Sequence, residues 1–235
     1  MAELYNNQRE YFLFIVSLVV AGAIGTVALG FFLKILEDLY GQGLRQFDES
    51  AFEVIYSLRS QELNQVVTFI THMGGAPAYF ILIPFIGLWL YYRGHNWKIP
   101  VQSTIILLTA FLLNIGLKYF IARPRPLAGQ RLVEVYSYSF PSGHTMSAVA
   151  FYGFLIYLVF RYINSKRWKW ILTGVLSGLT AAIGISRVYL GVHYATDVMA
   201  GFVVGLFWLM ICIIAIRSIE FYRKRKKPSD PDTNN

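Results

Sequence analysis

Charged residues are scarce in this chain of 235 residues: Asp, Glu, Lys and Arg make up 14% of it, whereas hydrophobic residues make up 56%. The mean hydropathy is +0.49, which is far too apolar for an ordinary soluble domain. This composition excludes a soluble globular protein and indicates an integral membrane protein.

Several functional motifs are also missing. The chain contains no glycine-rich nucleotide loop, no paired metal-ligand motif and no long repeat. Its single cysteine, Cys212, cannot form an intrachain disulfide, so the redox compartment is left open. The net charge of +8 fits membrane topology and attraction to anionic lipid head groups, and we expect no nucleic-acid partner.

Six stretches are apolar enough to cross a bilayer, which takes about 20 helical residues. They cover residues 11–33, 78–92, 99–117, 145–160, 170–185 and 194–216. The second is short and contains Pro84, which we interpret as a kink. The first could instead be a cleaved signal peptide, because residues 21–23 resemble a processing site, but its apolar run continues to Phe32 and favours an uncleaved helix.

The segment 34–77 has a different pattern, with three basic and six acidic residues. Apolar residues recur at helical spacing, and Asp48, Glu49, Glu53 and Glu62 occupy the other positions. We expect these helices to lie flat on the outer leaflet, with cover for a lateral lipid entrance as the alternative. The predicted fold class is therefore all-α integral membrane, with six transmembrane helices and an outer-face interfacial helical segment between the first two.

Basic residues in alternate connections predict the orientation, because Lys and Arg are retained on the cytoplasmic side of short loops. They lie at 93–98, at 161–169 and after residue 216. We therefore expect a multi-pass protein of the cell membrane with both termini in the cytoplasm. Residues 1–222 form one transmembrane domain in this scheme, and residues 223–235 form a basic, then polar, cytoplasmic tail.

One predicted outer loop breaks the charge pattern. Residues 118–143 contain Lys118, Arg123, Arg125 and Arg131 but only one acidic residue, Glu134. Positive charge kept on the outer side indicates a site that needs cations.

Three sequence segments place ionisable residues at the outer ends of the predicted helices. They are KYFIARPRP at 118–126, PSGH at 141–144 and SRVYLGVHYATD at 186–197. Placing an ionisable group in or near the membrane costs free energy, so such residues are treated as candidates for a functional site. Lys118, Arg125 and Arg187 supply many donors and no acceptor, which suits a multiply charged oxyanion.

The PSGH segment predicts an anion cradle. Ser142 is placed to cap the following helix, so the backbone N–H groups around Gly143 and His144 would face an anion. The glycine would let that anion approach the backbone closely.

His193 and Asp197 are four residues apart, which puts them on one helix face. A carboxylate bonded to one ring nitrogen raises the basicity of the other. One of the two histidines, His144 and His193, could then attack while the other protonates a leaving oxygen. Each residue alone has a structural alternative, a bonded core histidine or a local His–Asp hydrogen bond, but their joint occurrence in three segments favours a site.

The motifs Lys118-x6-Arg125-Pro126, Pro141-Ser142-Gly143-His144 and Ser186-Arg187-x5-His193-x3-Asp197 resemble the tripartite signature of the membrane type 2 phosphatidic acid phosphatases. They span residues 118–197 without departure at the signature positions. The chain also resembles bacterial phosphatidylglycerophosphate and undecaprenyl-diphosphate phosphatases. Soluble vanadate-binding haloperoxidases share the anion pocket, but six spans in 235 residues argue against that activity.

The resemblance implies an enzyme that hydrolyses lipid phosphate or diphosphate esters at the outer membrane face, without a metal or other cofactor. It implies His193 as the nucleophile that forms a phosphohistidine, Asp197 as its orienting partner, and His144 as acid and then base. Five residues would hold the phosphoryl oxygens: Lys118, Arg125, Ser142, Gly143 and Arg187. Vanadate is expected to inhibit, because it mimics the trigonal-bipyramidal transition state.

The substrate, the choice between an enzyme and a transporter, and the oligomeric state each have an alternative. Undecaprenyl diphosphate is ranked first as substrate, with phosphatidylglycerophosphate or phosphatidic acid as the alternative. A lipid transporter or scramblase is the non-enzyme alternative, and it predicts ionisable residues throughout the membrane depth. The GVLSG and GFVVG motifs at 174–178 and 201–205 favour close packing of the last two helices, with a weak homodimer as the alternative to a monomer.

Overall fold

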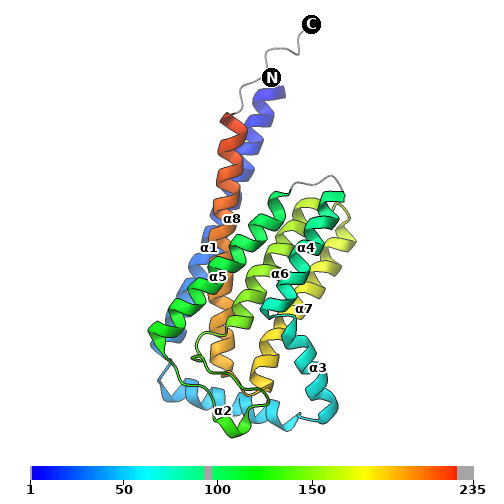
Figure 1. Cartoon of the computed structure of the whole chain (residues 1–235). Coiled ribbons are helices and arrows are strands. Elements are labelled where there is room, and N and C mark those ends of the chain that lie inside the picture. The colour runs from blue at the N-terminus through cyan, green and yellow to red at the C-terminus, as the bar shows by residue number, and fades with distance from the viewer. Residues whose placement is uncertain (1, 93–96, 227–235) are drawn as a thin grey trace.

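The computed structural model describes residues 2–92 and 97–226. Within these ranges all regular structure is helical (Figure 1): α1 (Ala2–Glu37), α2 (Gln42–Ser57), α3 (Gln61–His72), α4 (Ala76–Tyr92), α5 (Lys98–Ile121), the 3-10 helix η1 (Ala128–Gln130), α6 (Gly143–Tyr162), α7 (Lys166–Tyr189) and α8 (Ala195–Lys226). The polar tail after residue 226 lies outside the described residues.

Five of these helices are long and apolar enough to cross a membrane: α1, α5, α6, α7 and α8. The sixth predicted span is reached only if α3 and α4 are taken together, as a pair bent by 55° at a short break. The helical fold class with five to six spans is therefore confirmed. The large bend lies at the break between α3 and α4, whereas α4 continues through Pro84.

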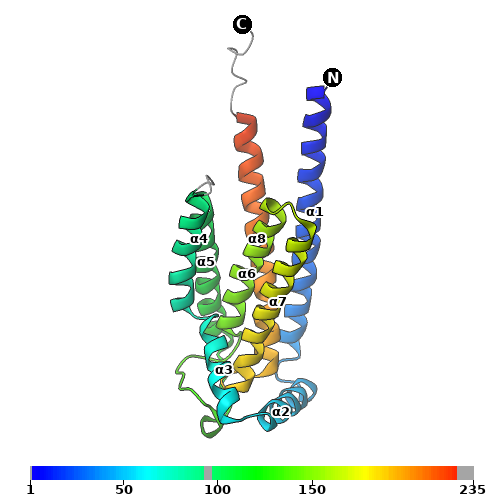
Figure 2. The ribbon, with the colours of Figure 1, turned by 90° about the vertical axis from the view of Figure 1, so that its right-hand side faces the viewer.

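The long helices form a bundle in which α6 packs against α5, α7 and α8, while α1 runs beside α8 (Figures 1 and 2). Small and large apolar side chains of the α6 region fill the centre, and Phe140, Met146, Ala150 and Phe154 are fully buried. Burial of such side chains stabilises the bundle through close packing. The start of α1 and the end of α8 lie at the same end of this bundle, and α2 lies at the opposite end.

The glycine motifs pack differently from the prediction. An added Cβ at Gly201 or Gly205 of α8 would lie 2.8 or 2.9 Å from atoms of Ser142 or Met146, which belong to the start of α6. At Gly174 and Gly178 of α7, an added Cβ would meet nothing within 4 Å. The expected pairing of the two motifs was therefore wrong, because the α8 glycines admit the backbone of α6.

The segment 34–77 is helical as predicted, but its two helices differ. Figures 1 and 2 show α2 lying across the end of the bundle, whereas α3 rises toward α4. Helix α3 packs against α7 and buries Val67 and Thr71, so the expectation that it lies flat was wrong. Asp48 was assigned to the polar face of α2, yet it is only 2% exposed.

The corner between α2 and α3 is tied to the end of α7. Arg59 Nε donates to the carbonyl oxygen of Tyr189 at 2.9 Å, and its Nη1 donates to that of Gln130 at 2.9 Å. Carbonyl groups at a helix C-terminus lack partners within the helix. Arg59 therefore satisfies one of them and fixes α2 and α3 over this end of the bundle.

Candidate active site

A cavity of about 790 Å³ is lined by residues of α4, α5, the 122–142 loop, the start of α6 and the end of α7. Six of the eight predicted site residues line it: Lys118, Arg125, Gly143, His144, Arg187 and His193. The other two, Ser142 and Asp197, are fully buried. The structure thus brings the three sequence motifs together from α5, the 122–142 loop, the start of α6 and the junction of α7 and α8.

His193 is placed by a tight turn between α7 and α8. Gly191 takes a left-handed backbone conformation, with φ of 71°, which glycine adopts without strain. The turn presents the imidazole so that Nδ1 lies 3.3 Å from Asp197 Oδ2 and Nε2 lies 3.4 Å from Arg125 Nη1. A carboxylate at Nδ1 selects the tautomer in which Nε2 carries the lone pair.

Burial sets the protonation state of His193, which is 2% exposed. Burial lowers the pKa of this imidazole to about 3, although the bond to Asp197 opposes the change. The ring is therefore neutral near pH 7. A neutral Nε2 at the edge of a cationic cavity can attack an electrophilic phosphorus atom.

Asp197 has more partners than the sequence indicated. It accepts hydrogen bonds from the Ser139 hydroxyl, from the Tyr194 backbone N–H at 2.9 Å and from Arg123 Nη1 at 2.6 Å, in addition to its contact with His193. In the sequence, Arg123 is only one of the four cations of the outer loop, and no motif singles out Ser139. No spacing rule links residues 123 and 139 to position 197, so only the fold identifies them.

Arg187 is 4% exposed, and one of its buried donors has no hydrogen-bond partner. Its Nη1 donates to Thr71 Oγ1 of α3 at 2.7 Å, while its Nε has no hydrogen-bond partner. Buried polar groups without partners are costly and rare. Because Arg187 lines the cavity, an anionic ligand there could accept this hydrogen bond.

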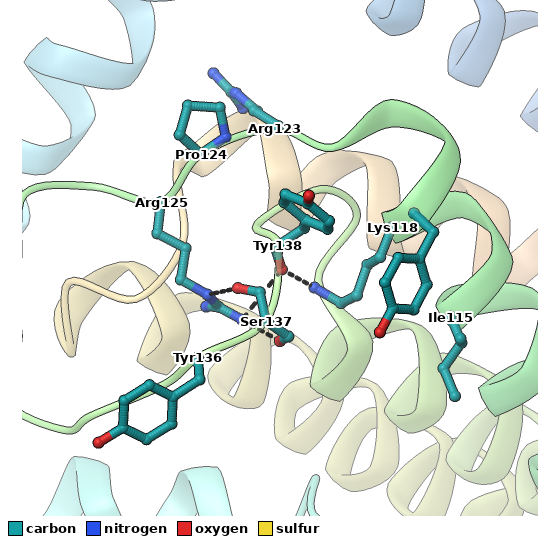
Figure 3. A pocket seen from close by; sticks show the side chains of 9 residues that line it. Ile115, Lys118, Arg123, Pro124, Arg125, Tyr136, Ser137 and Tyr138 are labelled. Atoms are coloured by element: carbon teal, nitrogen blue, oxygen red, sulfur yellow. Dashed lines mark hydrogen bonds between the residues drawn. The ribbon is translucent and has the colours of Figure 1, made fainter.

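Lys118 and Arg125 lie on either side of the Ser137–Tyr138 backbone, as Figure 3 shows, and both line the cavity. Lys118 Nζ donates to the carbonyl oxygen of Tyr138, and Arg125 donates to Ser137 and to the Val192 carbonyl oxygen at 2.6 Å. Burial lowers the pKa of Arg125 to about 10, so it remains charged near pH 7. Both side chains also line a second cavity of about 460 Å³ with Ile115, Tyr119, Tyr136 and Tyr138.

The PSGH turn differs from the expected anion cradle in two details. Ser142 stands at the N-cap of α6 but its side chain caps no backbone N–H; its hydroxyl accepts from Thr145 Oγ1 at 3.0 Å. An added Cβ at Gly143 would lie 2.8 Å from Asn114 Oδ1. The glycine therefore admits Asn114, whose amide donates to the Pro141 carbonyl oxygen at 3.2 Å and fixes the turn from α5.

No group of three or more His, Cys, Asp or Glu residues that could hold a metal ion is present in residues 2–92 and 97–226. The charge in the cavity comes from the side chains of Lys118, Arg125 and Arg187. Metal-independent action remains a prediction.

Comparison with known proteins agrees with these motifs. Residues 100–220, which contain all three, match the PAP2 superfamily. The chain belongs to the PAP2 superfamily.

Relatives within this superfamily resemble most of the chain. It is 36% identical over 180 residues to phosphatidylglycerophosphatase B of Bacillus subtilis, covering 75% of this chain and 86% of the relative. It is 27% identical over 215 residues to undecaprenyl-diphosphatase of Sulfolobus acidocaldarius, covering 89% and 93%. The crystal structure of a transmembrane PAP2-type phosphatidylglycerolphosphate phosphatase from Bacillus subtilis superimposes with a TM-score of 0.75 at 30% identity, covering 88% of this chain and 98% of that one.

Proposed function

We propose that this membrane lipid phosphatase of the PAP2 superfamily hydrolyses its lipid phosphate or diphosphate substrate through a phosphohistidine on His193. The observation that carries the proposal is one cavity in which His193 and His144 meet Lys118, Arg125 and Arg187. The superfamily and the names of its relatives support a lipid phosphatase.

In the first step, Nε2 of His193 attacks phosphorus and a P–N bond forms. The P–O bond to the lipid breaks, its electron pair leaves with the lipid oxygen, and His144 donates a proton to that oxygen. For a diphosphate, the leaving group is the lipid monophosphate. Asp197 accepts a hydrogen bond from the Nδ1–H group and stabilises the ring as it gains positive charge.

In the second step, His144 takes a proton from water as the water oxygen attacks phosphorus. The P–N bond then breaks, its electron pair returns to Nε2, and inorganic phosphate leaves. Throughout both steps Lys118, Arg125 and Arg187 stabilise the charge on the phosphoryl oxygens. Preorganised donors of this kind are each worth about 10²- to 10³-fold in rate.

The apolar part of the cavity supports lateral entry of a lipid. Beyond the cations, the cavity is lined by residues of α4 and α5: Phe80, Ile83, Leu107, Leu108 and Phe111. It extends along α5 from Lys118 to Thr104, and 14 residues of helix rise by about 21 Å. Phe80 and Leu108 are also exposed on the outside of the bundle. A lipid would place its phosphate at the cations and its tails along this groove.

Two substrates are the first to compare. The resemblance to bacterial members ranks undecaprenyl diphosphate first, whereas the relative with 36% identity is named phosphatidylglycerophosphatase B. We therefore propose phosphatidylglycerophosphate as the first substrate to test and undecaprenyl diphosphate as the second. Both carry a terminal phosphate on a long apolar anchor.

The charge pattern supports an orientation with the cavity on the extracytoplasmic face and both termini in the cytoplasm. The basic residues of 161–169 and 217–226 lie at the bundle end opposite α2. They favour the cytoplasmic side. The cations near the cavity are the exception, and binding of an anionic substrate explains them.

Phosphate release in detergent with EDTA present tests the proposal. The parent protein should hydrolyse lipid phosphates, and His193→Ala should lose about 10³-fold or more in kcat. His144→Ala should also be impaired, and more strongly for poor leaving groups, because it protonates the departing oxygen. Full activity of His193→Ala would show that His193 is not the nucleophile. A strict requirement for magnesium would contradict the metal-independent mechanism.

A further inference from the structure

Asp48 is buried between α2 and the start of α8, although α2 is an amphipathic helix at the end of the bundle. Its Oδ1 accepts from the backbone N–H of Thr196 at 2.8 Å, and its Oδ2 accepts from Thr196 Oγ1 at 2.7 Å and from Arg123 Nη2 at 2.8 Å. The first N–H groups of a helix lack partners within it. Asp48 therefore caps, from another helix, the first turn of the helix that carries Asp197.

Arg123 joins this carboxylate to the site. Its Nη1 donates to Asp197 Oδ1 at 2.6 Å and to Thr196 Oγ1 at 2.8 Å, while its Nη2 donates to Asp48. The guanidinium lies 4.2 Å from the ring centroid of Tyr194, a cation–π contact. In Figure 3 the Arg123 side chain points away from Lys118 and Arg125, so it does not join them at the substrate phosphate.

The charges of this cluster do not cancel. Asp48 and Asp197 carry two negative charges against the one positive charge of Arg123, and burial leaves His193 neutral. Although burial opposes it, the two carboxylates raise the pKa of Arg123. Without Asp48, Arg123 would pair with Asp197 alone and neutralise it. With Asp48, the cluster of Asp48, Arg123 and Asp197 keeps one net negative charge on the Nδ1 side of His193, whereas Arg125 lies on the Nε2 side.

We propose that Asp48 is a positioning residue for the reaction: acting through Arg123 and Thr196, it holds Asp197 and His193 in the attacking orientation and preserves negative charge beside the ring. The inference rests on the proposed phosphohistidine mechanism. An imidazole that bonds to phosphorus through Nε2 while Nδ1 stays protonated becomes cationic, and that charge favours a net negative neighbour. Asp48 touches neither substrate nor the imidazole.

Asp48→Asn tests this role, because it removes the charge with little change in volume. In the full-length protein with phosphatidylglycerophosphate as substrate, kcat should fall by about 10- to 100-fold, by analogy with the residues that orient metal-bound histidines. KM should stay within about 3-fold, because the cations that bind phosphate are untouched. The matched control is Glu49→Gln on the same helix, where Glu49 forms an exposed pair with Arg45 at 2.9 Å; its kcat should not change.

A double-mutant cycle separates positioning from general stability. If Asp48 acts through Arg123, adding Asp48→Asn to the Arg123→Lys variant should lower kcat much less than Asp48→Asn lowers the kcat of the parent protein. Additive losses would overturn the inference, as would a normal kcat for Asp48→Asn or a KM that rises in step with the fall in kcat. Activities are to be normalised to monodisperse, folded protein.

A second variant covers the case in which Asp48→Asn does not fold. Thr196→Val removes the hydroxyl that bridges Asp48 and Arg123 and keeps the side-chain shape. Its kcat should fall several-fold at constant KM, and an unchanged kcat would overturn the inference. Failure of the proposed function would look different, since the parent protein would then be inactive or His193→Ala active.

Discussion

Arg187 carries one of the few buried side-chain donors in the described residues that lack a hydrogen-bond partner. Thr71 of α3 fixes one end of its guanidinium at 2.7 Å, and Nε remains free. The planar fork of arginine holds several donors in fixed directions, whereas lysine offers a single ammonium group. Replacing Arg187 by lysine therefore keeps the positive charge but changes the number and direction of the hydrogen-bond donors.

Arg187→Lys should lower kcat/KM by about 10- to 100-fold, because a preorganised donor to the phosphoryl oxygens is lost. Vanadate should bind more weakly by a similar factor if it mimics the transition state. Steady-state kinetics and vanadate inhibition measure the two quantities. Arg167→Lys, at the exposed opposite end of α7, is the matched control and should change neither. Weaker vanadate binding without loss of kcat/KM would contradict this prediction.

Helix α8 is the element that joins the site to the core. Its first turn carries Asp197 and receives Asp48, and its glycine face admits α6 at Gly201 and Gly205. The PSGH turn at the start of α6 is consequently held against α8, and Ser142 N–H donates to the Asp197 carbonyl oxygen at 3.0 Å. The distance between the two histidine-bearing segments thus depends on close contact between these helices.

Gly205→Ala should destabilise the protein by about 1 to 3 kcal/mol, because the new methyl group would overpack the contact with Met146 and Val149. The apparent Tm in detergent should fall, and activity should fall with it. Gly178→Ala places the same methyl group in open space on α7. It should leave Tm unchanged or raise it, since alanine favours a helix by about 1 kcal/mol over glycine. Equal effects of the two substitutions would contradict this packing scheme.

At the scale of the whole molecule, the bundle separates two ends of different character. The cavity, α2 and the cationic loop lie at one end, and the basic residues 161–169 lie at the other. The apolar groove between α4 and α5 connects the cavity to the side of the bundle. This arrangement suits a substrate whose phosphate lies at a membrane surface and whose tails lie within the bilayer.

Cysteine labelling of intact cells measures the orientation. In a Cys212→Ala background, Gln130→Cys near the cavity end should react with an impermeant reagent added from outside, because residue 130 is exposed. Ser165→Cys, exposed at the other end, should react only after permeabilisation. The reverse pattern would place the cavity in the cytoplasm.

The amino-acid sequence by itself determined the helical membrane class, most of the spans and the signature residues, because hydropathy and short spacings are local properties of the chain. Lys118, His144, Arg187 and His193 could be found in this way, and the structure brings them into one cavity.

Tertiary structure alone decided which surfaces meet. Asp48 looked like a solvated residue of an amphipathic helix, yet it bonds to Thr196, 148 residues away. Ser142 had the spacing of a capping residue, but its hydroxyl bonds to Thr145 instead, and α3 bends into α4 because it packs on α7. Contacts between residues far apart in the chain depend on the fit of whole helices, which no local pattern specifies.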